Sequence, residues 1–96
     1  MQINFSNQLF NIHIRKEIPS FELNFPTWPN LHLKPLTCEI QINGKIFRPK
    51  EIHAEIQSGD ILYLKWLFPD AQICLNQKVT FSSEGWLNLH SDLENL

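Results

Sequence analysis

The side chains of this sequence best suited to proton transfer are histidines with acidic neighbours, and the closest grouping lies around His53. Glu51 and Glu55 flank it at a spacing of two residues. A His–Glu pair can act as a general acid and base, but catalysis also needs a nucleophile and an orienting group, and no nucleophile motif accompanies these residues. We therefore interpret them as a solvated face of a short helix and expect no enzyme activity.

No other combination of residues suggests a metal or cofactor site. Zinc sites usually contain closely spaced ligand pairs such as Cys-x-x-Cys or His-x-His. The four histidines stand apart, at positions 13, 32, 53 and 90. The three glycines, at positions 44, 59 and 85, fit turns and do not form a phosphate-binding loop. We expect neither a metal nor a cofactor.

The two cysteines, Cys38 and Cys74, are too few for a disulfide framework. In an extended chain Cys38 shares a face with apolar residues, so we expect it to be buried. Cys74 shares a face with Gln72 and Asn76, so we expect it to be exposed. Two unpaired thiols indicate a reducing compartment, and we expect a cytoplasmic protein.

Length and charge narrow the possible functions. A chain of 96 residues fits one domain, and 43% apolar with 19% charged residues is typical of a globular protein. The net charge of −2 gives no basic surface for nucleic acid. No apolar run approaches the roughly 20 residues of a membrane span, and no secretory signal is visible. We therefore expect neither nucleic-acid binding nor membrane insertion.

Alternating apolar and polar residues predict a mostly β chain. We expect extended segments over residues 2–14, with a bend near Ser6-Asn7, and strands over residues 21–25 and 36–42. Asn43-Gly44 then predicts a two-residue hairpin turn into residues 45–47, because both turn positions require positive φ.

One segment departs from this alternation. Pro49 suits the first turn of a helix, and Ile52 and Ile56 lie four residues apart. Residues 49–57 therefore predict one or two helical turns. Gly59, which follows, is expected to end the helix and to adopt a positive φ.

The central strand is predicted at residues 61–68, where apolar side chains occur on both faces. Beyond it we expect strands at 71–75, 78–81 and 86–90, turns at 69–70, 76–77 and 82–85, and a frayed acidic tail at 91–96.

Aromatic and apolar residues of this second half suggest a protein interface. One small sheet can bury one face of the central strand, but burying both requires the N-terminal segment or a second molecule to cover it. Trp28, between two prolines, fits a docking residue better than a core residue. The candidate interface residues are Trp28, Leu62, Leu64, Trp66, Phe68 and Trp86.

From about Leu36 to His90 the sequence resembles a SpoA domain, the small β module of flagellar switch proteins and of the cytoplasmic ring protein of type III secretion systems. The family pattern L-x-x-G-D-x-L-x-L corresponds to the segment Ile56-Gln57-Ser58-Gly59-Asp60-Ile61-Leu62-Tyr63-Leu64. The Leu36–Phe47 hairpin, residues 71–75 and Gly85-Trp86-Leu87 also match. The closing Gly-Val-x-Ile strand of the family is missing, and the chain is most like the first of two tandem copies.

The resemblance implies a small SpoA-like β-barrel or meander with one short helix, intertwined with a partner copy. It divides the chain into an N-terminal extended region (1–35), a SpoA-like domain (36–91) and a tail or linker (92–96). It also implies a non-enzymatic assembly module of the secretion sorting platform. Its partners would be another SpoA domain, in a homo- or heterodimer, and apparatus proteins such as the ATPase stator.

A different class of function stays open at this point. A small phage-type inhibitor or a carbohydrate-binding β domain could use Trp28, Trp66 or Trp86 as a binding platform.

Overall fold

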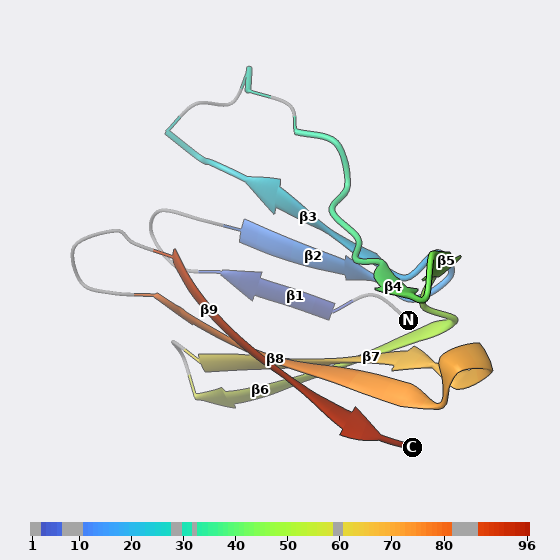
Figure 1. Ribbon diagram of the computed structural model, residues 1–96. Helices are drawn as coiled ribbons and strands as arrows, with labels where there is room; N and C mark the ends of the chain where they lie inside the picture. The colour runs from blue at the N-terminus through green and yellow to red at the C-terminus, as the bar shows by residue number, and fades with distance from the viewer. Residues whose placement is uncertain (1–2, 7–10, 28–29, 32, 59–60, 82–86) are drawn as a thin grey trace.

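The computed structural model contains two packed β-sheets and a separate hairpin (Figure 1). It describes residues 3–6, 11–27, 30–31, 33–58, 61–81 and 87–96. The strands of this part of the chain are β1 (Ile3–Ser6), β2 (Asn11–Arg15), β3 (Ser20–Asn24), β4 (Ile40–Ile42), β5 (Lys45–Phe47), β6 (Glu51–Ser58), β7 (Ile61–Phe68), β8 (Ile73–Phe81) and β9 (Leu87–Asn95). A single 3₁₀ turn, η1 (Pro69–Ala71), joins β7 to β8. The expected mostly β class is therefore confirmed.

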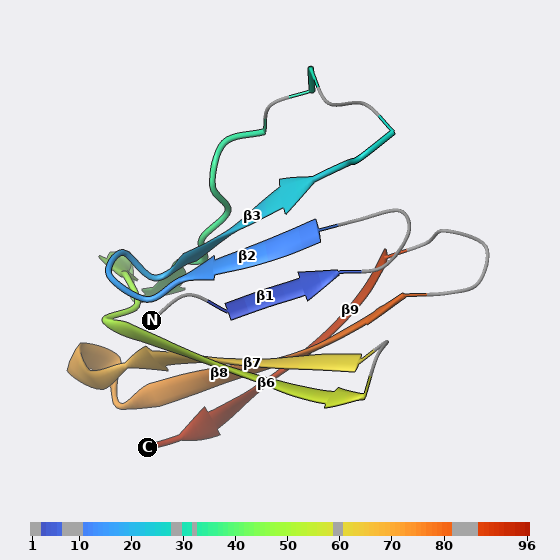
Figure 2. The same ribbon diagram turned by 180° about the vertical axis from the view of Figure 1, so that it is seen from behind.

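These strands form three antiparallel sheets, of which the two-stranded one is the separate hairpin. Their orders are β1-β2-β3, β4-β5 and β6-β7-β8-β9, so every strand pairs with its neighbour in sequence. The described strands form open sheets and do not close into a barrel. Figure 2 shows the three-stranded sheet lying over one face of the four-stranded sheet. No segment of the described residues forms a helix with the length and hydrophobicity needed to cross a bilayer.

The core fills the space between these two sheets. β2 contributes Ile12 and Ile14, because alternation along a strand turns every second side chain to the same face. β3 contributes Phe21 and Leu23, and the facing sheet contributes Ile52, Leu62, Leu64, Trp66, Phe68 and Val79. The N-terminal residues thus belong to the same core as the central strand.

The hairpin and the central strand follow the sequence prediction. Asn43 and Gly44 have φ values of 51° and 81°, as a turn of mirror-image type requires, and Ile42 pairs with Lys45. The central strand spans the predicted residues, Ile61 to Phe68, and lies between β6 and β8.

The predicted helix at residues 49–57 is wrong, because most of this segment forms strand β6. Ile52 and Ile56 are four residues apart, a spacing that fits a helix and equally fits a strand. Ala54 between them completes an apolar row of period two, and Ile52 is buried opposite Trp66 of β7. Pairing along the whole of β7 therefore decides the conformation.

The predicted turn at residues 76–77 is also wrong, since β8 continues through it. Asn76 and Gln77 pair with Lys65 and Leu64 of β7. Their side chains have specific partners: the Asn76 amide donates to Asp92 at 3.2 Å, and Gln77 accepts the Trp66 indole N–H at 2.8 Å. These bonds compensate for polar residues in the middle of a strand.

The C-terminal residues are not a frayed tail. β9 runs to Asn95, which pairs with Ile73 of β8. Near the N-terminus, the bend expected in residues 2–14 is a reversal between the antiparallel strands β1 and β2. The strand predicted at 36–42 is shorter, because Leu36 instead bridges Phe21 at the edge of β3 through N–O bonds of 2.7 and 2.8 Å. The φ of Gly59 and the turn at 82–85 lie outside the described residues.

The core position of Leu64 gives a first test. Leu64→Ala should reduce the free energy of unfolding by about 2–4 kcal/mol, because the side chain is only 2% exposed and its removal leaves a cavity. Urea unfolding followed by far-ultraviolet circular dichroism measures the change. The matched control Leu33→Ala, at a position 44% exposed, should change it by less than about 0.5 kcal/mol. Equal losses for the two variants would contradict this core.

The hairpin turn gives a second test. A Cβ at Gly44 would meet no described atom within 4 Å, so the effect of Gly44→Ala isolates the strain of a positive φ. We expect a loss of about 1 kcal/mol in the same unfolding experiment. Asn43→Gly, which relaxes the other positive φ, should be close to neutral. A neutral Gly44→Ala would argue against this turn.

Candidate functional site

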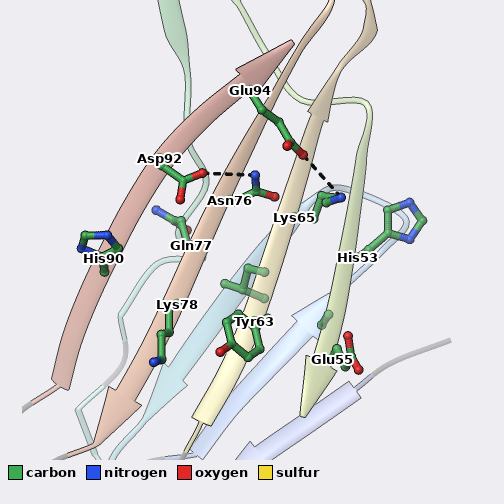
Figure 3. Close-up of a pocket in the computed structure, with 12 residues that line it drawn as sticks. His53, Glu55, Tyr63, Lys65, Asn76, Gln77, Lys78, His90, Asp92 and Glu94 are labelled. Carbon is green, nitrogen blue, oxygen red and sulfur yellow. Dashed lines mark hydrogen bonds and ion pairs between the residues drawn. The ribbon is translucent and has the colours of Figure 1, made fainter. Parts of the chain in front are cut away.

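A broad depression lies on the outer face of the four-stranded sheet, opposite the core (Figure 3). Alternation turns His53 of β6, Tyr63 and Lys65 of β7, Lys78 of β8 and His90 of β9 to this side. The depression is open to solvent and has a volume of about 910 Å³. Its lining is polar and carries both signs of charge.

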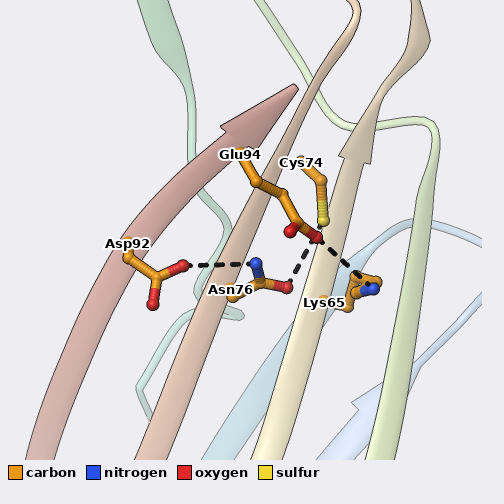
Figure 4. A network of polar contacts seen from close by, with 5 residues as sticks. All are labelled: Lys65, Cys74, Asn76, Asp92 and Glu94. Atoms are coloured by element: carbon orange, nitrogen blue, oxygen red, sulfur yellow. Dashed lines mark hydrogen bonds and ion pairs between the residues drawn. The ribbon is translucent and has the colours of Figure 1, made fainter. Parts of the chain in front are cut away.

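The charged groups of this outer face are largely paired with one another (Figure 4). Lys65 Nζ lies 3.6 Å from a Glu94 carboxylate oxygen. Asp92 accepts the hydrogen bond from the Asn76 amide. Both contacts connect β9 to the inner strands, and because they are exposed each contributes at most about 1 kcal/mol. They fix the orientation of β9 side chains more than they stabilise the fold.

Tyr63 is the aromatic ring of the depression. Its side chain is 37% exposed, and the Lys78 ammonium lies 6.0 Å from the ring centroid. This geometry permits a weak cation–π contact. Lys78 and Glu55 lie beside this ring, and the two acidic residues of β9, Asp92 and Glu94, lie at the other end of the face (Figure 3).

Cys74 lies at the base of the polar network and not on the surface, contrary to the sequence prediction. Cys74 lies on the outer side of β8, as the alternation of side chains along the strand predicts. Its side chain is nevertheless fully buried. The thiol donates to Asn76 Oδ1 at 3.5 Å. Burial raises the pKa of Cys74, Lys65 lowers it, and the Glu94 carboxylate raises it. The long side chains of the neighbouring strands cover a residue that alternation alone places outside.

The candidate acid–base pair forms an exposed contact. His53 Nε2 lies 3.1 Å from a Glu51 carboxylate oxygen, and the two side chains are 55% and 62% exposed. Both belong to strand β6, on its outer face. In the part of the chain that the structure describes, no three His, Cys, Asp or Glu side chains gather closely enough to hold a metal ion.

Four predicted interface residues lie inside this chain's own core. Leu62, Leu64, Trp66 and Phe68 are each at most 2% exposed. The N-terminal sheet covers them, with the Phe21 and Trp66 rings 6.2 Å apart between centroids. As surface candidates they are therefore wrong. Trp28 and Trp86 lie outside the described residues.

Strand β9 carries the apolar residues that the sequence prediction missed. Leu89 and Leu93 are 52% and 60% exposed and point to the core-facing side of the sheet, beyond the cover of β1–β3. The signal was present, since Leu87, Leu89 and Leu93 share one parity. Interpreting residues 91–96 as a tail concealed it.

Comparisons with known proteins add no relative: no protein-family model, curated sequence or solved structure matches this chain.

The thiol of Cys38 gives a third test. Burial raises the pKa of Cys38 from 9.0 to about 12, so the folded state keeps the thiol proton while the unfolded state releases it above pH 9. The contribution of this group to stability is therefore complete below pH 9 and decreases as the pH rises toward 12.

In a Cys74→Ser variant, thiolate absorbance at 240 nm should stay low in the folded protein at pH 9–10 and appear near pH 9 in urea. Cys38→Ser in the same background supplies the blank. A folded protein that titrates at the unfolded pKa would contradict the half-buried position of Cys38.

Proposed function

We propose that this chain is a non-enzymatic assembly module of the SpoA type, part of the cytoplasmic sorting platform of a type III secretion system. It acts by pairing with another SpoA domain and by docking apparatus proteins such as the ATPase stator. The observation that carries the proposal is the position of the family-like segment: its apolar residues Leu62 and Leu64 are the centre of the core.

The order of elements supports the proposal. The resembling region, residues 36–90, contains a tight hairpin followed by four consecutive antiparallel strands. In the sequence the Gly-Asp pair comes immediately before β7, the strand that it is expected to precede. Cys38 and Cys74 are both free thiols, as suits a reducing cytoplasm.

Two features depart from the resemblance. The helical segment before the Gly-Asp pair is strand β6, and the meander ends in a long edge strand, β9. The chain also has a core of its own, so pairing would add to a folded unit and would use its surface. The outer face and β9 are the described surfaces best placed for that role.

Mixing the chain with a purified second SpoA domain of a type III secretion ring protein tests the proposal. We expect a stable complex whose mass, by size-exclusion chromatography with light scattering, equals the sum of the two components. An unrelated β-sandwich domain of similar size serves as control. If the two SpoA-type chains elute as separate species at about 100 μM, the proposal fails, since even a weak specific pair would be partly formed there.

Carbohydrate binding is the second candidate, and the outer depression is the observation that favours it. Trp66 is 1% exposed and is excluded as a platform. Tyr63 is the aromatic ring of the described outer face, beside the hydrogen-bonding groups of Asn76 and Asp92. A glycan titration followed by tyrosine and tryptophan fluorescence, compared with Tyr63→Ala, distinguishes this candidate from assembly.

A further inference from the structure

The far edge of β9 is the longest unpaired strand edge in the described structure. β9 lies at one end of the four-stranded sheet, and its C-terminal end lies away from the three-stranded sheet (Figure 1). Its pairing with β8 is continuous from Leu87 to Asn95, without a bulge. Proline, a bulge or charged side chains, lysine above all, protect an edge of this kind from pairing with another strand. β9 has no proline, lysine or bulge, and its two carboxylates, Asp92 and Glu94, contact Asn76 and Lys65 of the same sheet.

The other described edges are shorter or obstructed. β3 is bridged by Leu36 next to its N-terminal end. β6 carries a register irregularity between Ile56 and Ser58, a feature that disfavours strand addition. β9 is therefore the edge most open to a partner.

Hydrogen-bond geometry selects which residues of β9 face that partner. The Leu96 N–H donates to the Gln72 carbonyl at 2.9 Å, in register with the β8–β9 ladder. Because backbone groups alternate in an antiparallel pair, even-numbered residues of β9 bond to β8. The odd-numbered residues Leu89, Ser91 and Leu93 turn their N–H and C=O groups to the open edge.

The side chains of β9 are complementary to those of a second β9 strand placed antiparallel to it. In an antiparallel pair centred on Ser91, Leu89 lies opposite Leu93 of the second copy, and His90 lies opposite Asp92 of the second copy. Two-fold symmetry forms each contact twice. The leucines occupy one face of the joined sheet and the His–Asp pairs the other.

Neighbouring registers lack this complementarity. In antiparallel pairs centred on His90 or on Asp92, the outward N–H and C=O groups of the two copies can still bond to each other. These registers, however, place two histidines or two carboxylates directly opposite. Two carboxylates directly opposite repel each other, and two opposed histidines lack the acidic partner that the register centred on Ser91 provides. Hydrogen bonding permits all three registers, and the one centred on Ser91 is preferred among them because it joins the leucines and places unlike polar groups opposite each other.

We propose that β9 is a self-association site, through which a second copy of this chain adds edge to edge about Ser91 and extends the sheet to eight strands. The exposed leucines beyond β1–β3 are then covered by their symmetry mates. This association exchanges no element between the copies, and it rests on β9 alone, independently of any family assignment.

Proline at the centre of the edge provides the first experiment. Ser91→Pro removes an N–H that faces outward, so the fold should remain, as proline is tolerated on the open side of an edge strand. Ser91→Ala removes the hydroxyl that accepts from Gln77 but keeps this N–H, and serves as the matched control. Light scattering should give twice the 11.3 kDa chain mass for the wild type and for Ser91→Ala, and the mass of one chain for Ser91→Pro.

Charge exchange provides the second experiment and remains informative if Ser91→Pro fails to fold. His90→Glu sets a carboxylate opposite Asp92 of the second copy at two places and should weaken the dimer at least about tenfold. Adding Asp92→Lys to His90→Glu restores opposite charges and should recover most of the affinity. Analytical ultracentrifugation measures both dissociation constants.

Three results would overturn the proposal: a wild-type monomer at about 100 μM, a Ser91→Pro variant that dimerises as the wild type does, or a double variant no tighter than His90→Glu. Mixing Ser91→Pro with the second SpoA domain separates this proposal from the function proposed above. If Ser91→Pro is a monomer and still binds that domain, both proposals are supported. If the wild type forms a homodimer but does not bind that domain, self-association is supported and the proposed function is not.

Discussion

The structure depends on one contact between layers, the packing of the N-terminal sheet onto the central strand. Trp66 and Phe68 of β7 are both 1% exposed, and they share one core with Ile14 and Phe21 of the opposite sheet, where the Phe21 ring lies beside Trp66. Without this cover, the row from Leu62 to Phe68 would face water, at about 25 cal/mol for each Å² of apolar surface exposed. Strands β2 and β3 are therefore part of the same domain as the central strand.

The same contact covers the strands of the four-stranded sheet to different extents. β7 is fully covered on one face, whereas β9 extends beyond the cover and has exposed leucines. The outer face stays polar, with its charges paired between β7, β8 and β9. Surfaces for recognition are thus at the margin of the sheet and on its outer side, and the residues of the central strand serve stability.

Local sequence patterns were sufficient to predict secondary structure where the spacing of apolar residues fitted only a helix or only a strand. Asn43-Gly44 permits little besides a tight hairpin, and Ile61 to Phe68 was recognised as a strand with its bounds. At Ile52 and Ile56 the helix and strand periods coincide, and only pairing with β7 distinguishes them. Asn76-Gln77 resembles a turn because the bonding partners of those amides, Trp66 and Asp92, lie on other strands.

The candidate sites were harder to predict than the fold. Apolar residues on both faces of β7 indicated that a cover was needed, but not that the chain's own N-terminal sheet supplies it for one face. Leu93 belonged to a segment interpreted as a frayed acidic tail, so it was not placed on the same strand as Leu89. Burial of Cys74 depends on long side chains of adjacent strands, which no pattern within β8 encodes.

The exclusive pairing of strands with their sequence neighbours has a kinetic consequence. Each sheet can form by successive hairpins, since no ladder between named strands joins distant parts of the chain. Short loops of this kind close rapidly, whereas the meeting of β2 and β3 with β7 brings together residues about fifty positions apart and is entropically slower. Docking of the two layers should therefore limit the folding rate, with the hairpins already formed when Trp66 becomes enclosed.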